Sequence, residues 1–78
     1  NAISAGPMRT LAASQIEGFD NMLKVYEQVA PMRRCISQDD VGDLAIFLGS
    51  DLSKNITGQV IFVDAGYSTL AMAELPKD

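Results

Sequence analysis

Few side chains in this 78-residue chain are of the types that commonly perform chemistry. The chain has no histidine, which is the usual general base, and its single cysteine, Cys35, has no histidine beside it to activate the thiol. Without histidine or a second cysteine, a soft metal ion has no set of ligands. Asp39 and Asp40 form an acidic pair, but Ser37 precedes them as a helix N-cap, and capping is sufficient to explain both carboxylates. The residues therefore indicate neither a metal site nor an acid–base pair.

Two adjacent cations, Arg33 and Arg34, are the other candidates for binding chemistry. A phosphate clamp would need support that the sequence does not give. Solvation, or salt bridges to the nearby Asp39 and Asp40, explains the two arginines. Cys35 is expected to pack passively or to be partly exposed.

Composition and charge exclude several classes of protein. Apolar residues make up 47% of the chain, which is not a disordered composition. The net charge of −4 argues against a nucleic-acid or anionic-membrane surface. No stretch approaches the roughly 20 apolar residues of a membrane span. A chain of this length is only marginally able to fold alone.

The most informative stretch is the opening of the chain. Ala2 and Ile3 are typical of the last residues of a buried strand, and Gly6 and Pro7 then turn the chain sharply. Ligands of open α/β sheets lie outside the carboxyl ends of strands. The segment after the bend is therefore either a loop over a ligand or a plain connection without a role in binding.

Two helices are predicted to follow this loop. Apolar residues from Phe19 to Val29 fall on one face, which predicts a helix over about residues 19–30 that ends before Pro31. Phe19 follows a break at Gly18 and could face a pocket under the preceding loop. A second helix is predicted over about residues 38–49, with its apolar stripe wide enough for burial on more than one side.

A short apolar run over about residues 59–64 predicts a strand buried on both faces, as in a parallel sheet. The expectation from the residues is that this strand lacks parallel neighbours within the chain. The chain is therefore predicted to be the carboxyl-terminal part of a larger α/β domain, and to be inactive and poorly folded alone. The apolar tail over residues 69–73 is a candidate for docking on a partner subunit.

Two groups of residues resemble known enzymes. The run from Ser4 to Ser14, Ser-Ala-Gly-Pro-Met-Arg-Thr-Leu-Ala-Ala-Ser, is similar to the cofactor- and substrate-loop segment of the enoyl-acyl-carrier-protein reductases of bacterial fatty-acid synthesis. A later, less specific group resembles the whole short-chain dehydrogenase/reductase superfamily; it comprises residues 30–34, 39–42, 47–53, 56–58 and 63–67. Ala65 departs from this pattern, since the superfamily commonly has a glycine there.

The resemblance covers essentially all 78 residues, as the last third of the family's chain. It implies a Rossmann-type doubly wound parallel sheet, of which residues 1–78 form the carboxyl-terminal part of a single dinucleotide-binding domain. The implied reaction is reduction of trans-2-enoyl-acyl-carrier-protein with NADH. The catalytic tyrosine and lysine of the family would lie upstream of Asn1, so no catalytic residue is assigned to this chain.

The resemblance also assigns roles within a cofactor and substrate loop, residues 4–19. The cofactor-binding residues would be Met8, Arg9, Thr10, Leu11 and Ala12. Backbone groups near Met8 would bind the carboxamide of the nicotinamide, and the Thr10 hydroxyl would reach the pyrophosphate. The substrate-binding residues would be Ala12, Ala13, Ile16 and Phe19, which match a loop that closes over the acyl chain and excludes water.

The implied partners are the amino-terminal part of the same protein, acyl carrier protein with an enoyl thioester, and three further copies in a homotetramer. The implied location is the bacterial cytoplasm, with a plastid as the alternative. Two other functions stay open. One is a ketoacyl-type reductase of the same superfamily, against which the run Ala12-Ala13-Ser14 argues. The other is a non-catalytic piece whose second helix and last strand form a subunit interface.

Overall fold

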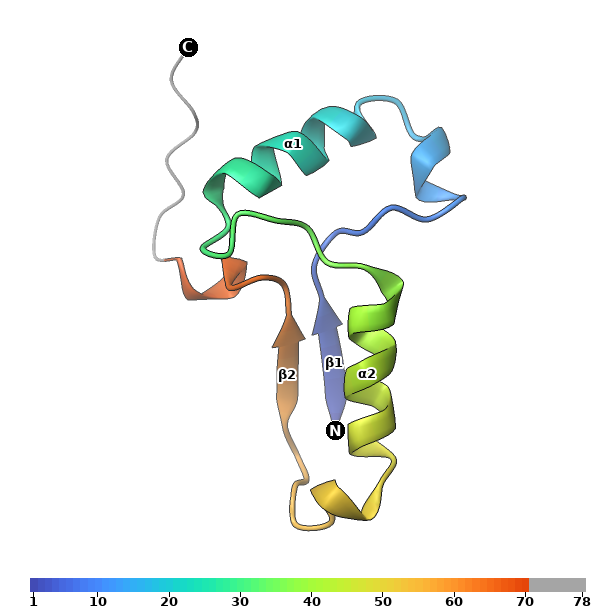
Figure 1. Cartoon of the computed structure of the whole chain (residues 1–78), viewed down its shortest axis with the longest axis vertical. Helices are drawn as coiled ribbons and strands as arrows, with labels where there is room; N and C mark the ends of the chain where they lie inside the picture. The colour runs from blue at the N-terminus through green and yellow to red at the C-terminus, as the bar shows by residue number, and fades with distance from the viewer. Residues whose placement is uncertain (71–78) are drawn as a thin grey trace.

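The computed structural model describes residues 1–70 as a small parallel α/β unit (Figure 1). Strand β1 spans Ala2–Ala5, helix α1 Phe19–Val29, helix α2 Gln38–Leu48 and strand β2 Val60–Val63. Three single-turn 3₁₀ helices lie at Ala13–Gln15, Asp51–Ser53 and Tyr67–Thr69. Residues 71–73 of the proposed docking tail lie outside the described residues.

The two strands pair directly with each other, which corrects the expectation that the last strand has no neighbour in this chain. β1 and β2 are parallel, with Ala2 opposite Val60 and Ala5 opposite Val63. The prediction was wrong because the opening stretch extends beyond Ala2 and Ile3. It is a strand of four residues that bonds along the whole of β2.

Helix α2 has the predicted start and runs antiparallel to the strands beside β1 (Figure 1). The Ser37 side chain accepts a hydrogen bond from the Asp40 backbone N–H, and the Asp40 carboxylate accepts one from the Ser37 N–H at 2.8 Å. This capping box satisfies amide groups that have no partner inside the helix. The prediction that Asp40 takes part in capping the helix is therefore confirmed.

Burial on several sides of α2, and on both faces of β2, was expected and is not observed within residues 1–70. Ile46 on α2 is 74% exposed, and Val60 and Phe62 on one face of β2 are exposed while Ile61 and Val63 are half-buried. The reason is that the described part of the chain places one helix beside the sheet, so one face of the sheet is covered.

Helix α1 matches its predicted bounds and lies over the carboxyl ends of the strands (Figure 1). Tyr26, near the end of this helix, packs with Ala30 and Ala65 in the buried core. Ala65 has a left-handed backbone with φ of 56°, which gives a physical reason for the glycine that the superfamily commonly has there. The core therefore joins the end of α1 to the turn that follows β2.

Candidate functional site

The Gly6–Pro7 bend lies at the carboxyl end of both strands. The Gly6 N–H donates to the carbonyl oxygen of Val63 at 2.9 Å, which extends the strand pairing by one residue. A Cβ atom at Gly6 would lie 2.6 Å from the hydroxyl oxygen of Tyr26 and 3.2 Å from the Cα of Asp64. Only a residue without a side chain fits at this position, so the backbone is held close to β2.

After the bend comes the run Met8–Ala12, to which the cofactor role was assigned. Its backbone N–H groups donate to no acceptor among residues 1–70. The Thr10 hydroxyl oxygen accepts a hydrogen bond from the Ala13 N–H at 3.1 Å, and no acceptor within residues 1–70 takes the hydroxyl proton. Five consecutive amides and one hydroxyl are thus available as donors, a donor-rich set that suits a ligand with many acceptor oxygens.

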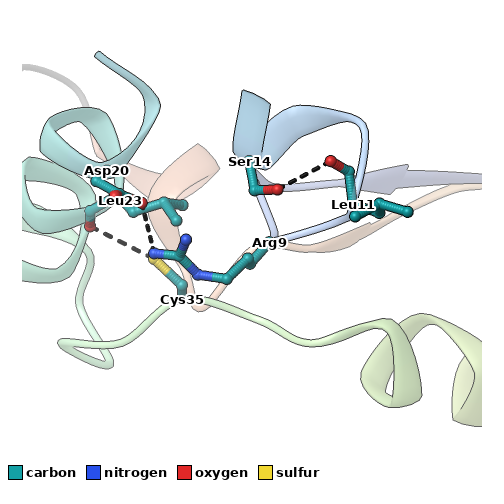
Figure 2. A network of polar contacts seen from close by, with 6 residues as sticks. All are labelled: Arg9, Leu11, Ser14, Asp20, Leu23 and Cys35. Atoms are coloured by element: carbon teal, nitrogen blue, oxygen red, sulfur yellow. Dashed lines mark hydrogen bonds and ion pairs between the residues drawn. The ribbon is translucent and has the colours of Figure 1, made fainter. Parts of the chain in front are cut away.

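Arg9 is anchored to helix α1 rather than pointing away from the chain (Figure 2). Its Nη2 atom lies 2.6 Å from Oδ1 of Asp20, which is in the first turn of α1. Both side chains are largely exposed, at 58% and 68%. An exposed pair of this kind contributes little stability, but it ties the start of the loop to the start of the helix.

The residues assigned to substrate binding lie in the sequence between Arg9 and Asp20, the two partners of that ion pair. Ala13 begins the 3₁₀ turn and is half-buried, as is Phe19 at the start of α1, whereas Ala12 is exposed. Ile16 is 62% exposed, and the neighbouring Leu11 is 82% exposed. The Ser14 hydroxyl donates to the Leu11 carbonyl at 2.8 Å, which closes the turn between them (Figure 2). The segment therefore presents apolar side chains outward from a locally bonded turn.

Gly18 separates this segment from α1. It has a left-handed backbone with φ of 81° and occupies the N-cap position of the helix. The break predicted at Gly18 is therefore the cap position of the helix.

A cleft of about 450 Å³ opens beside the bend. Its lining comes from the end of β1 and the bend, from α1, and from the end of β2 and the turn after it: Ser4, Ala5, Gly6, Pro7, Met22, Tyr26, Phe62, Asp64, Tyr67 and Ser68. Gly6 and Pro7 of the bend line this cleft, whereas none of the residues Met8–Ala12 lines it. Sequence reasoning gave no site role to Met22 or Tyr26, because a helical apolar stripe is typical of core residues, and it gave none to Tyr67.

Tyr26 lines the cleft with its hydroxyl already engaged in a hydrogen bond. The Tyr26 hydroxyl donates to the backbone carbonyl of Asp64. Burial, together with the nearby Asp64 carboxylate, raises the pKa of Tyr26 from 10.0 to about 12. Tyr26 therefore stays protonated at neutral pH, with its hydroxyl donating to Asp64.

Cys35 lies in a second cleft of about 380 Å³ that Arg9 and Asp20 also line. Its thiol is half-buried, with Sγ 3.5 Å from the carbonyl oxygen of Leu23 (Figure 2). Burial, reinforced by Glu27, raises the pKa of the Cys35 thiol, although Arg9 opposes the shift. Passive packing of this thiol, as expected, is what the structure shows.

Residues 1–70 contain no group of three or more histidine, cysteine, aspartate or glutamate side chains that would hold a metal ion. In the same part of the chain, neither α1 nor α2 has the length and apolar character that crossing a bilayer requires.

Parallel strands joined through helices, with a glycine bend at their carboxyl ends, define a Rossmann-type α/β protein. The family model described as enoyl-(acyl carrier protein) reductase matches residues 1–68. This chain belongs to that family.

The relatives are longer proteins, and this chain matches a part of each. The chain is 54% identical over all 78 residues to enoyl-acyl-carrier-protein reductase (NADH) FabI of Haemophilus influenzae, and 57% identical over 75 residues to that of Escherichia coli K12. It spans 30% and 29% of their lengths.

Solved structures agree with the sequence relatives. The Bacillus cereus enoyl-acyl carrier protein reductase with NADP⁺ and indole naphthyridinone matches at a TM-score of 0.83 and 49% identity, over 91% of this chain and 28% of that one. The Anaplasma phagocytophilum enzyme in complex with NAD matches at 0.80 and 44%, over 95% and 28%. These similarities confirm the predicted fold class.

Proposed function

We propose that the protein containing residues 1–78 reduces the trans-2 double bond of enoyl thioesters on acyl carrier protein, with NADH as the reductant. Family membership and relatives named as NADH-dependent reductases support this proposal. The 78 residues would form the carboxyl-terminal part of its single dinucleotide-binding domain. The remaining part of the domain would supply the further strands and the pyrophosphate turn.

The observation that carries the cofactor assignment is the run Met8–Ala12, whose amides find no acceptor among the described residues 1–70. A dinucleotide presents phosphate and carboxamide oxygens, which are acceptors. Amides near Met8 would bind the carboxamide and the Thr10 hydroxyl the pyrophosphate, while Arg9 stays paired with Asp20 beside them. When bound, NADH supplies the hydride that is delivered to the β carbon of the enoyl group.

The substrate side of the site would be the apolar turn after that run. Ala12 and Ala13 are small, and Ile16 and Phe19 are apolar, so they suit an acyl chain. The exposed Ile16 side chain gains burial when the segment covers such a chain, and water is excluded from the reacting carbons.

No side chain of this chain is assigned to proton transfer. The family's tyrosine, which stabilises or protonates the enolate, and its lysine, which binds the nicotinamide ribose, would come from the rest of the domain. A homotetramer in the bacterial cytoplasm, or in a plastid, is the assembly and location that the family resemblance implies.

The test is to express the full coding sequence that contains these residues and to follow NADH oxidation with two thioesters. Crotonyl thioester is expected to be reduced, and acetoacetyl thioester is not. Thr10→Ala is expected to weaken NADH binding, while Thr10→Ser, which keeps the hydroxyl, retains most of it. Preferential reduction of acetoacetyl thioester would favour the ketoacyl-reductase alternative, and activity of residues 1–78 alone would contradict the need for the rest of the domain.

A further inference from the structure

Tyr26 is the side chain that joins the three segments around the bend. It projects from α1, its hydroxyl donates to the Asp64 carbonyl at the end of β2, and its ring is 8% exposed. The same ring stacks on Tyr67, with centroids 4.8 Å apart. The hydrogen bond and the stack hold the Tyr26 side chain in place. Tyr26 therefore fixes the distance between α1 and the end of β2.

The hydroxyl of Tyr26 also lies directly behind the bend. The position that a Cβ would take on Gly6 is 2.6 Å from this oxygen and 3.2 Å from Asp64 Cα. Gly6 is also held by the hydrogen bond from its N–H to the carbonyl oxygen of Val63, at 2.9 Å. The backbone of Gly6 is thus confined between Tyr26 and the end of β2.

The run of free amides begins two residues beyond Gly6. Pro7 lies between Gly6 and Met8. Because the φ angle of Pro7 is fixed, a shift of Gly6 also moves Met8. Two residues span at most about 7 Å, and therefore Met8 cannot keep its place if Gly6 moves substantially.

We infer that Tyr26 is a positioning residue for the run Met8–Ala12, because its hydroxyl fixes the Gly6–Pro7 bend from which that run begins. This inference rests on the proposed function, in that Met8–Ala12 is the cofactor-binding run. Tyr26 sets the affinity for the dinucleotide and takes no part in the reaction itself.

The experiment compares Tyr26→Phe with Tyr67→Phe in the full-length protein. Each substitution removes one hydroxyl and keeps the stacked ring, but the Tyr67 hydroxyl makes no hydrogen bond with residues 1–70. Tyr26→Phe is expected to raise the Kd for NADH by about 3- to 10-fold, the effect of one lost hydrogen bond, with kcat at saturating NADH changed less than about twofold. Tyr67→Phe is expected to leave both unchanged. An unchanged Kd for Tyr26→Phe, or an equal loss in both variants, would overturn the inference.

Gly6→Ala provides a second, independent arm. Alone, it places a methyl group against the Tyr26 oxygen and weakens NADH binding. In the Tyr26→Phe background the clashing atom is gone, so the additional loss from Gly6→Ala is expected to be smaller. If the double variant raises the Kd for NADH by the product of the two separate increases, the role of the hydroxyl is contradicted.

Amide hydrogen exchange separates this inference from the proposed function. Tyr26→Phe is expected to speed exchange at the Gly6 amide, which donates to Val63, whereas Tyr67→Phe is not. If the unsubstituted protein binds no NADH, the proposed function fails, and the exchange rates still decide whether Tyr26 holds the bend. Equal exchange in all three proteins would refute the positioning role.

Discussion

The rings of Tyr26 and Tyr67 stack with their planes inclined by 19°, across 41 positions of sequence (67 − 26). The stack lies where the end of α1 meets the turn after β2, and Tyr26 adds a hydrogen bond to Asp64 there. This junction supports the bend from which the proposed cofactor run begins, so its stability is linked to the site.

The Tyr26 hydroxyl is expected to make the protein lose stability at alkaline pH. Its pKa is raised from 10.0 to about 12 in the folded state, so its contribution is complete below about pH 10 and is lost as the pH approaches 12. The contribution is at most roughly 3 kcal/mol, at about 1.4 kcal/mol for each pKa unit. Urea unfolding of the full-length protein and of Tyr26→Phe, at about pH 9 and about pH 11.5, checks this. The difference in unfolding free energy is expected to shrink at the higher pH, and a constant difference would contradict the assignment.

Removing the Ser37 cap is expected to destabilise α2. Ser37→Ala leaves the Asp40 N–H without its side-chain acceptor, at a cost of about 1 kcal/mol. Thermal unfolding of the full-length protein measures the loss. Thr57→Ala is the matched control, because the exposed Thr57 side chain makes no hydrogen bond within residues 1–70. Equal shifts in the two variants would show that the capping box does not stabilise the helix.

The Arg9–Asp20 ion pair is expected to slow opening of the loop by a small, salt-sensitive factor. Exposed pairs contribute up to about 1 kcal/mol, so Asp20→Asn should speed exchange of the hydrogen-bonded amides of Ser14 and Ile16 by no more than about fivefold. In about 1 M salt the difference should nearly disappear because the charges are screened. Asp43→Asn removes an equal charge from the exposed side of α2 and should have no effect. A salt-independent change would indicate that Asp20 acts through something other than charge.

The Cys35 thiol is expected to react slowly with alkylating reagents. Its pKa lies above the ordinary thiol value, chiefly because of burial and secondarily because of Glu27. Mass spectrometry of the Cys35 peptide gives the rate of alkylation against pH. Glu27→Gln is expected to move the midpoint to lower pH, and Asp43→Asn is not. A midpoint below that of a free thiol would contradict the burial of this group.

Local sequence patterns predicted the helices well. The apolar spacing from Phe19 to Val29 and the cap at Ser37 gave bounds that the structure matches to within a residue or two, because periodicity and capping act within a few residues. The break at Gly18 could be predicted for the same reason. Each of these features depends on neighbours in sequence.

Contacts across the chain were not predictable in this way. The pairing of β1 with β2, and the approach of Tyr26 to Asp64 across 38 positions, depend on how distant segments meet. The exposure of Val60, Phe62 and Ile46 depends on which other segments pack beside them. The apolar pattern of a single element does not predict those neighbours. The roles proposed for Met8–Ala12 came from the family resemblance, and local patterns could not predict that these amides find no acceptor within residues 1–70.

The measurement that bears most directly on the whole account is amide hydrogen exchange of the full-length protein with and without NADH. Saturating NADH is expected to protect the amides of Met8–Ala12, which donate to no acceptor among residues 1–70. If NADH binds to the protein but the exchange rates of these five amides do not change, the assignment of this run to the cofactor is contradicted.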